Sequence, residues 1–268
     1  MFAALGVDWV YVALPVPTGR VAQAMDGVRA LGIAGLSVTM PHKAAVARAV
    51  DRLSPTARLL GAANTVTRHG DALLGASTDG DGFIAALRTD EGWDAAGRHC
   101  LVIGTGGAAR AVVLALADAG AASVSVVGRR PSAAAEAAEL AGDAGRVAGI
   151  EAAADADLIV NATPVGMSGG AVVALGNTPP PVVAALPMGI DPSRMGPGQL
   201  VVDLIYVPPS TPLLDAARRA GAQAVNGLGM LIHQAALQSR LWTGMDPPLE
   251  VMSAAAVAAL TIGGDTEA

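Results

Sequence analysis

Residues 101–110 of this chain, LVIGTGGAAR, restrict its possible folds more than any other segment. An apolar run typical of a buried strand leads directly into glycines, and a long apolar helix is predicted over residues 109–120. Gly104, Gly106 and Ala109 have the G-x-G-x-x-A spacing of a dinucleotide-binding turn, whose small residues allow a tight turn and close approach of a pyrophosphate. The residues expected to hold the phosphates at the helix N-terminus are Gly104, Thr105, Gly106, Gly107 and Ala108. Glycine-rich turns also occur in other folds, so a scaffold without a cofactor is the alternative.

The end of the next predicted strand indicates which dinucleotide is bound. In an NAD site a carboxylate at this point pairs with the free ribose 2′-hydroxyl. Here the strand 123–128 ends in Gly128-Arg129-Arg130 instead. Two guanidinium groups suit a 2′-phosphate, so the sequence favours NADP over NAD. The alternative is a pair of solvated surface arginines.

The segment around this turn reads as one repeating α/β series. Strands are predicted over 99–104, 123–128, 157–163 and 199–205, and helices over 109–120, 133–142 and 213–221. Residues 163–199 are rich in Gly and Pro and are predicted to form long irregular connections. This pattern predicts a Rossmann-type, doubly wound NADP-binding domain over residues 98–227.

Residues 1–97 show a second α/β pattern, which predicts a separate catalytic domain. Strands are predicted over 7–16 and 33–39, and helices over 20–31, 42–53 and from Ser54-Pro55 to Gly61, with Pro41 in a first helical turn. Alternation of strand and helix predicts parallel pairing. The helices predicted at 230–244 and 249–260 are expected to pack back on this domain or along the hinge, so residues 228–268 join it. Residues 263–268 are expected to be a frayed tail.

Composition excludes several classes of function. The net charge is −6 and the arginines form no basic stripe, which argues against nucleic-acid binding. The apolar runs are too short to span a bilayer, the N-terminus lacks secretory features, and a single cysteine, Cys100, forms no intrachain disulfide. No Cys/His cluster suggests a metal site. We expect a cytoplasmic protein that acts on a small molecule as a monomer or homodimer.

One residue of the segment TMPHK is unusual: Lys43 is the only lysine, whereas the other permanent cations are arginines. A guanidinium stays protonated, but an ammonium can transfer a proton, so arginine cannot replace a lysine that does so. Nucleotide composition alone also explains a lone lysine. However, Asn64 and Asp79 likewise follow apolar segments, and loops at the carboxyl ends of parallel strands converge on one crevice. We therefore expect these three side chains to face one another.

Seven segments of this chain resemble those of the shikimate dehydrogenase family, in the same order. They are LSVTMPHK, GAANTV, STDGDGF, GTGGAARA, NATPVGM, VDLIYVPPSTPLL and NGLGMLIHQAAL. The resemblance implies two α/β domains with the active site in the cleft between them, and NADP-dependent interconversion of 3-dehydroshikimate and shikimate. It also implies that Lys43 and Asp79 are the catalytic pair. An ammonium near the carbonyl would supply the proton that accompanies hydride transfer, while Asp79 would position it.

The resemblance assigns further roles near the substrate and the cofactor. The residues expected to bind or border the substrate are Thr39, Asn64, Tyr206 and Gln234. Those expected near the cofactor, besides the glycine turn and the arginine pair, are Asn161, Thr163, Met167, Gly227 and Met230. From the residues alone, a role as helix N-cap is favoured for Asp79, as turn former for Asn64 and as solvent-facing helix residue for Gln234. His42 and His233 are expected to have packing roles.

The sequence departs from the family in two places. Family members begin with one more strand and a serine motif, S-x-S-P, that binds the substrate carboxylate, and nothing before Met1 supplies them. We expect either a start assigned too far downstream or a lost carboxylate anchor. Ser77 also replaces a usual Asn. Two rival functions therefore stay open: a quinate or other hydroxy-acid dehydrogenase of the same superfamily, and a non-catalytic NADP-binding protein.

Overall fold

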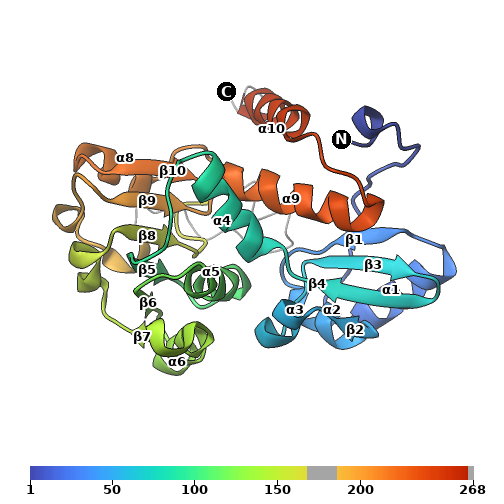
Figure 1. Ribbon diagram of the computed structural model, residues 1–268, viewed down its shortest axis with the longest axis horizontal. Helices are drawn as coiled ribbons and strands as arrows, with labels where there is room; N and C mark the ends of the chain where they lie inside the picture. Colours follow the sequence, from blue (N-terminus) through green and yellow to red (C-terminus); the bar gives the residue numbers. More distant parts are fainter. Residues whose placement is uncertain (168–185, 265–268) are drawn as a thin grey trace. The chain divides into compact units, whose positions relative to one another are not determined.

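The chain forms two compact units in a computed structural model that describes residues 1–167 and 186–264 (Figure 1). One unit comprises Met1–Gly82 and Leu231–Ala268, and the other comprises Phe83–Met230. Two helices continue across the divisions, α4 (Asp79–Thr89) and α9 (Leu228–Thr243). The sequence predicts these boundaries at 97/98 and 227/228.

The first unit contains a four-stranded mixed sheet in the order β1-β3-β4-β2. Its strands are β1 (Gly35–Ser37), β2 (Arg52–Leu53), β3 (Thr65–His69) and β4 (Ala72–Ala76). Only β2 and β4 are parallel; β3 is antiparallel to both β1 and β4. The predicted parallel sheet was therefore wrong for this unit. The physical reason is the two-residue Gly70-Asp71 turn, with Gly70 at φ +61°, which reverses the chain directly into a hairpin.

Three helices accompany this sheet: α1 (Val21–Ala30), α2 (Lys43–Ala49) and α3 (Pro55–Leu60). The N-terminus of α3 forms as predicted, because the Ser54 hydroxyl accepts a hydrogen bond from the Ala57 amide and Pro55 occupies the first turn. Two details of α2 differ from the prediction. Pro41 lies before the helix, after a cis peptide bond, and the helix ends at Ala49 because the chain then pairs as β2.

The core of this unit is aliphatic and lies between the sheet and α1–α3. Its buried residues are Val21, Met25, Val28, Val38, Val46, Ala47, Ala57, Ala63, Val66 and Leu73. The alternation of buried and outward-facing residues on α1 follows the helical period that was read from the sequence.

Residues 7–16, predicted as a strand, do not form one. A short 3₁₀ helix, η1 (Phe2–Leu5), precedes an extended segment that the structure assigns to no sheet. Val10, Tyr11 and Val12 are exposed at 85%, 65% and 62%. An alternating apolar pattern makes a strand only where a neighbouring strand accepts its backbone hydrogen bonds, and none of the described strands pairs with it.

The last two helices, α9 and α10 (Leu249–Gly264), agree with the prediction in type and position. Trp242 of α9 lies across β1 and β3 and donates its indole N–H to the Val66 carbonyl at 3.0 Å. Gly35 gives the indole this room, because a Cβ atom there would lie 2.3 Å from Nε1. Of the predicted tail, residues 265–268 lie outside the described residues. Among the described helices, none is long and apolar enough to cross a membrane.

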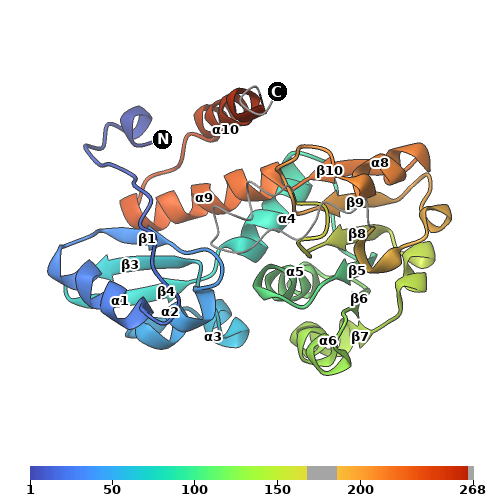
Figure 2. The same ribbon diagram turned by 180° about the vertical axis from the view of Figure 1, so that it is seen from behind.

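The second unit contains a fully parallel six-stranded sheet in the order β10-β9-β8-β5-β6-β7 (Figure 2). Its strands are β5 (His99–Ile103), β6 (Ser123–Val127), β7 (Gly145–Val147), β8 (Leu158–Asn161), β9 (Leu200–Asp203) and β10 (Gln223–Asn226). The sequence predicted β5, β6, β8 and β9 and missed the two edge strands. The Rossmann-type fold class is confirmed.

Helices cover both faces of this sheet, because successive strand residues point to opposite sides. Cys100 and Val102 pack in one cluster with α5 and α6, whereas Leu101 and Ile103 pack in the other with η3 and α8. The helical elements are α5 (Gly107–Asp118), α6 (Pro131–Ala138), η2 (Glu139–Ala144), η3 (Ile150–Asp155), η4 (Pro187–Gly189), η5 (Pro192–Arg194) and α8 (Pro212–Arg219). Within the predicted irregular connection, residues 168–185 lie outside the described residues.

Candidate active site

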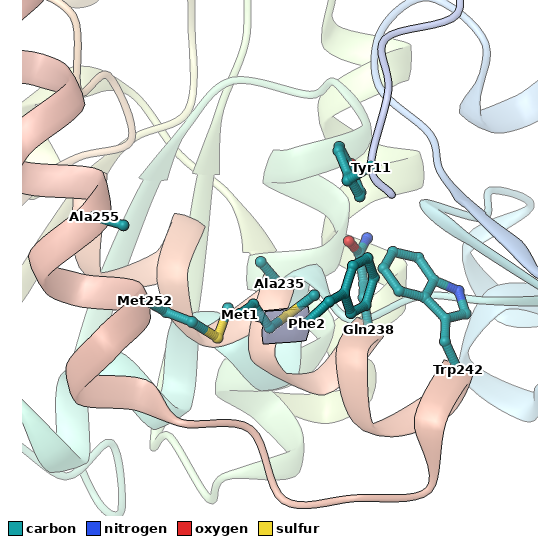
Figure 3. A pocket seen from close by; sticks show the side chains of 8 residues that line it. All are labelled: Met1, Phe2, Tyr11, Ala235, Gln238, Trp242, Met252 and Ala255. Atoms are coloured by element: carbon teal, nitrogen blue, oxygen red, sulfur yellow. The ribbon is translucent and has the colours of Figure 1, made fainter. Parts of the chain in front are cut away.

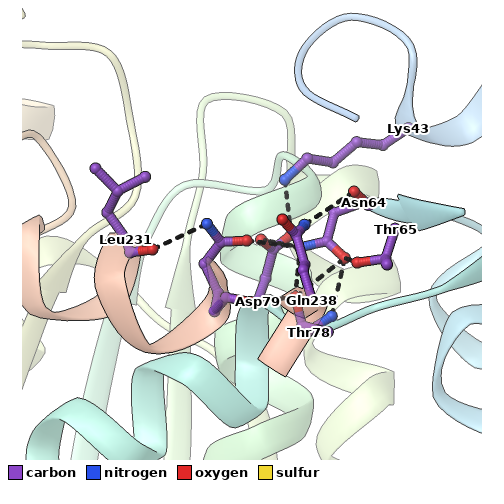
Figure 4. Close-up of polar contacts among 8 residues, drawn as sticks. Lys43, Asn64, Thr65, Thr78, Asp79, Leu231 and Gln238 are labelled. Atoms are coloured by element: carbon purple, nitrogen blue, oxygen red, sulfur yellow. Dashed lines mark hydrogen bonds and ion pairs between the residues drawn. The ribbon is translucent and has the colours of Figure 1, made fainter. Parts of the chain in front are cut away.

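Lys43 and Asp79 form an ion pair in the first unit. The ammonium Nζ donates to Oδ2 of Asp79 at 2.7 Å, and the two side chains are 19% and 9% exposed (Figure 4). Each residue begins a helix, Lys43 α2 and Asp79 α4. A carboxylate at a helix N-terminus is stabilised by the helix dipole, so Asp79 is favourably placed as an anion. The expected meeting of the two side chains is present in the structure.

Asn64 completes the coordination of this carboxylate. Its amide Nδ2 donates to Oδ1 of Asp79 at 2.8 Å and lies 2.9 Å from Oγ1 of Thr78. Its carbonyl Oδ1 accepts from the Thr78 amide at 2.9 Å and from the Thr65 hydroxyl at 2.8 Å. Asn64 is 2% exposed. Both oxygens of Asp79 are thus held, one by Lys43 and one by Asn64.

The sheet register explains why these side chains meet. Thr65 of β3 pairs with Ala76 of β4, so Asn64 and the segment after β4 lie opposite each other at one end of the hairpin. The Asn64 amide also donates to the Ala76 carbonyl at 3.0 Å, and the Ala63 amide donates to the Lys43 carbonyl at 3.0 Å. Backbone hydrogen bonds therefore fix all three segments before any ligand is present.

Gln234 reaches the same cluster from α9. Its Oε1 lies 3.2 Å from Nδ2 of Asn64, and its own Nε2 donates to the Leu231 carbonyl at 2.9 Å. The Thr78 hydroxyl donates to the Gln234 backbone carbonyl at 3.1 Å. Gly82 allows this approach, since a Cβ there would lie 2.6 Å from the Gln234 backbone nitrogen. Thr39, by contrast, is exposed in the loop before α2 and takes no part in the cluster's hydrogen bonds.

In the second unit, the strand ends form one row along the carboxyl edge of the sheet. The register pairs Val127 with Ile103, Ile103 with Asn161, Asn161 with Asp203, and Asp203 with Asn226. The residues expected at the cofactor all follow this row or belong to it. In an open parallel sheet, this edge is where a dinucleotide binds.

The glycine turn after β5 fits a bound pyrophosphate. Gly104 has φ +124°, and a Cβ there would lie 2.9 Å from the Ala162 carbonyl, so only glycine suits the position. Gly106, the N-cap of α5, is exposed, and a Cβ there would meet nothing within 4 Å. No side chain caps this helix, so the first-turn N–H groups of Gly107 and Ala108 are available to an anion. Thr105 lies against Gly128.

Arg129 and Arg130 follow β6 and are both exposed. Among the described residues, neither takes part in an ion pair. An arginine pair with no carboxylate partner, one strand away from the glycine turn, suits the extra phosphate of NADP.

The remaining predicted cofactor residues, and Tyr206 from the predicted substrate set, belong to the same unit. Asn161 ends β8, and its Oδ1 accepts from the backbone N–H and the hydroxyl of Thr163 at 3.0 and 2.7 Å. Gly227 follows β10, where a Cβ would lie 2.1 Å from the Leu204 carbonyl. Tyr206 follows β9 and is 37% exposed. Met167 is the last residue described before the gap, and Met230 packs against the core.

Comparison with known proteins identifies the family. A profile described as "Shikimate dehydrogenase substrate binding domain" matches residues 1–66, one described as "Shikimate 5'-dehydrogenase C-terminal domain" matches 227–257, and one described as "NADP oxidoreductase coenzyme F420-dependent" matches 100–203. A shikimate dehydrogenase (NADP(+)) of Geobacter metallireducens is 42% identical over 96% of this chain and 88% of its own length. The chain belongs to the shikimate dehydrogenase family.

Solved structures of this family have the same fold. Shikimate 5-dehydrogenase from Thermus thermophilus, in complex with NADP(H) and shikimate, superposes with a TM-score of 0.83 at 35% identity and covers 97% of this chain and 91% of its own. Quinate dehydrogenase from Corynebacterium glutamicum, in complex with NAD, superposes with a TM-score of 0.81 at 30% identity, covering 96% and 91%. The fold is thus shared by enzymes with different hydroxy acids and different cofactors.

Two polar residues of the structure, Thr78 and Asp203, were not predicted from the sequence of this family member. Thr78 joins Asn64 to Gln234, although the segment STDGDGF had been singled out for its aspartate alone. Asp203 is a fully buried carboxylate at the end of β9. Burial raises the pKa of Asp203 to about 6. Hydrogen bonds from Thr211, Ile205 and Asn161 have the opposite, smaller effect and lower it. A charged residue inside an apolar run, VVDLI, was the available signal.

A separate pocket of about 300 Å³ lies in the first unit, and neither Lys43 nor Asp79 lines it (Figure 3). It is mainly apolar and is lined by Met1, Phe2, Tyr11, Ala235, Gln238, Trp242, Met252 and Ala255. Gln238 is the link to the polar cluster, because its Nε2 donates to the Asn64 carbonyl at 3.1 Å. None of the predicted site residues lines this pocket.

Proposed function

We propose that this chain catalyses the reversible, NADP-dependent interconversion of 3-dehydroshikimate and shikimate, a step of the shikimate pathway that leads to chorismate and the aromatic amino acids. Its membership of the family supports the proposal, as do relatives named shikimate dehydrogenase (NADP(+)). The single observation that carries it is the 2.7 Å pair of Lys43 and Asp79, formed by the only lysine of the chain.

The bound nicotinamide supplies or accepts the hydride. In the direction of reduction, the Lys43 ammonium gives its proton to the ketone oxygen as the alcohol forms, and its positive charge stabilises negative charge that develops on that oxygen. The resulting neutral amine regains a proton from solvent. Asp79 holds the ammonium in place and is the acceptor for a ring hydroxyl of the substrate.

The remaining roles follow from the same proposal. Gln234 offers an amide beside Asn64 to substrate hydroxyls, and Asn64 keeps the Asp79 carboxylate oriented. Thr39 and Tyr206 are proposed to border the substrate. The glycine turn, Asn161, Thr163, Met167, Gly227 and Met230 are proposed to contact the dinucleotide, with Arg129 and Arg130 on its 2′-phosphate.

The test is turnover by the complete 268-residue chain. Shikimate and NADP are expected to give NADPH, followed by absorbance, with quinate and NAD as the competing pair. Preference for quinate would favour the alternative, a quinate dehydrogenase. This alternative is specific because a quinate dehydrogenase has the same fold. Cofactor binding without turnover of any hydroxy acid would indicate the non-catalytic alternative. We further propose that the protein is cytoplasmic and that it is a monomer or a homodimer. Light scattering after gel filtration measures the oligomeric state.

A further inference from the structure

We propose that Asp203 is a positioning residue for the cofactor. Its carboxylate, which the catalytic steps above do not use, fixes two loops at the carboxyl edge of the second unit's sheet. This inference rests on the proposed function and adds to it a residue that neither the glycine turn nor the catalytic pair includes. Its basis is the position of Asp203 in the strand-end row, where the register pairs it with Asn161. The two residues belong to β9 and β8, which lie side by side in the sheet (Figure 2).

The first loop held by Asp203 begins at Asn161. Oδ1 of Asp203 accepts from Nδ2 of Asn161 at 2.9 Å. This hydrogen bond fixes the Asn161 amide so that its Oδ1 faces the backbone N–H and the hydroxyl of Thr163. The Ala162 carbonyl between them lies against Gly104 of the glycine turn. A continuous set of contacts therefore runs from Asp203 to the turn that receives the pyrophosphate.

The second loop held by Asp203 runs from residue 204 to residue 211 and carries Tyr206. Oδ1 of Asp203 also accepts from the Ile205 amide at 3.2 Å, and Oδ2 accepts from the Thr211 hydroxyl at 2.7 Å. Thr211 is the N-cap of α8, so the helix start is tied to the strand end. Both ends of this loop are thus bound to one carboxylate.

Because the hydrogen bonds to Asp203 are buried, the residue at this position must be one that only accepts hydrogen bonds. Asp203, Asn161 and Thr211 are each 1% exposed or less, so water does not replace a lost partner at low cost. All the neighbours that bind Asp203 are donors, an amide nitrogen, a backbone N–H and a hydroxyl, and a carboxylate satisfies them with two oxygens. Burial also raises the pKa of Asp203, so the fold retains this group at a cost in stability.

The experiment compares NADPH affinity in variants of the complete chain, by fluorescence titration at a temperature where each variant is folded by circular dichroism. Asp203→Ala is expected to raise the Kd for NADPH by about tenfold or more, because both loops lose their anchor. Thr211→Val should raise it less, and Thr211→Ser should restore it because the hydroxyl returns. Arg219→Gln, an exposed change on α8, is the matched control and should leave the Kd within about twofold.

Steady-state kinetics distinguish positioning from general destabilisation. We expect the KM for NADP to rise in Asp203→Ala and Thr211→Val, with a smaller effect on kcat at saturating cofactor. If Asp203→Ala does not fold, the Thr211 pair decides the question. Folded variants with the wild-type Kd for NADPH would overturn the inference. Wild-type protein that binds no NADPH would overturn the proposed function first, and this inference with it.

Discussion

Asn64 donates its amide to the Asp79 oxygen that Lys43 leaves free, at 2.8 Å. The carboxylate is therefore held from two sides, by an ammonium on Oδ2 and by a buried amide on Oδ1. Asn64 is itself fixed by Thr78 and Thr65. The candidate catalytic pair thus belongs to a largely buried network that begins at the β3–β4 hairpin.

Lys43→Arg should keep the positive charge and lose turnover. A guanidinium stays protonated and cannot serve as the proton donor, so kcat is expected to fall by between about 100-fold and 10,000-fold. Arg48→Lys, an exposed change on the same helix, is the control and should leave kcat unchanged. Turnover of the Lys43→Arg variant close to that of the wild type would remove Lys43 from the proposed mechanism.

Asn64→Ala should impair catalysis through Asp79. The Asp79 carboxylate loses one of its two donors, and we expect kcat to fall by about tenfold to 100-fold. The free energy of unfolding should fall by about 1–3 kcal/mol, because the Thr78 amide loses its acceptor. In a double-mutant cycle with Asp79→Asn, the two effects on kcat should not add, since they act on one group. Additive effects would show that Asn64 acts independently of Asp79.

Gly82→Ala should move α9 away from α4 in the first unit. The added Cβ would lie 2.6 Å from backbone and side-chain atoms of Gln234, so we expect a loss of about 1–3 kcal/mol in unfolding free energy and a higher KM for shikimate. Gly27→Ala is the matched control, because Gly27 lies inside α1 with nothing within 4 Å. That variant should gain about 0.5–1 kcal/mol. Equal stability changes in both variants would contradict close packing at Gly82.

The double change Arg129→Gln with Arg130→Gln should weaken the preference for NADP. Losing two guanidinium groups from the 2′-phosphate is expected to raise the KM for NADP by about tenfold or more and to leave the KM for NAD unchanged. Arg219→Gln, an exposed arginine on α8, is the control. An equal rise of both KM values would place the arginine pair away from the 2′-phosphate.

Asp203 should make stability depend on pH in a direction opposite to most carboxyl groups. Its pKa is about 6 in the folded chain, because of burial, against an ordinary value of 3.8. The folded state thus binds its proton more tightly, so this contribution to stability is full below about pH 4 and is lost as the pH rises through about 6. A difference of this size between folded and unfolded pKa values corresponds to about 3 kcal/mol.

Denaturant unfolding of the wild type and Asp203→Asn at several pH values between about 4 and 8 measures this contribution. Asparagine does not titrate, so the stability of the wild type relative to the variant should fall as the pH rises from about 4 to about 6.5 and then level off. A difference that stays constant across this range would mean that the Asp203 carboxylate remains ionised throughout.

Local sequence patterns predicted the second unit well, because its strands are buried on both faces. The runs LVI and LVV are apolar enough to be read as strands without knowledge of their neighbours, and the glycine turn fixes the order of strand and helix. The edge strands β7 and β10 were missed, since their sequences, GRV and QAVN, are less buried than the central strands and contain no continuous apolar run. Their place depends on pairing with β6 and β9.

Predictions for the first unit were less accurate, for a different physical reason. Its sheet is set by long-range pairing, such as Gly35 with Thr67 and Arg52 with Leu74, which a local pattern does not contain. One signal was present: Gly70-Asp71, between TVTRH with its β-branched residues and the apolar run ALLGA, is a typical hairpin turn. Residues 7–16 show the opposite case: their sequence has a strand pattern, but among the described strands none pairs with them. Lys43, Asn64 and Asp79 were singled out because each stands at the boundary of an element, whereas Thr78 acts through Asn64 and Gln234, which lie far away in the sequence.

A chain with one lysine carries a built-in spectroscopic reporter at its candidate active site. Reductive methylation with ¹³C-formaldehyde modifies amines and leaves guanidinium groups untouched, so it would place labels on Lys43 and on the N-terminal amine alone. The Lys43 label would sit beside Asp79, on a side chain that is 19% exposed. The spectrum would contain the resonances of these two amines alone, and a variant without Lys43 would identify which belongs to the lysine. The electrostatic surroundings of this amine can then be followed directly during a titration with cofactor or hydroxy acid.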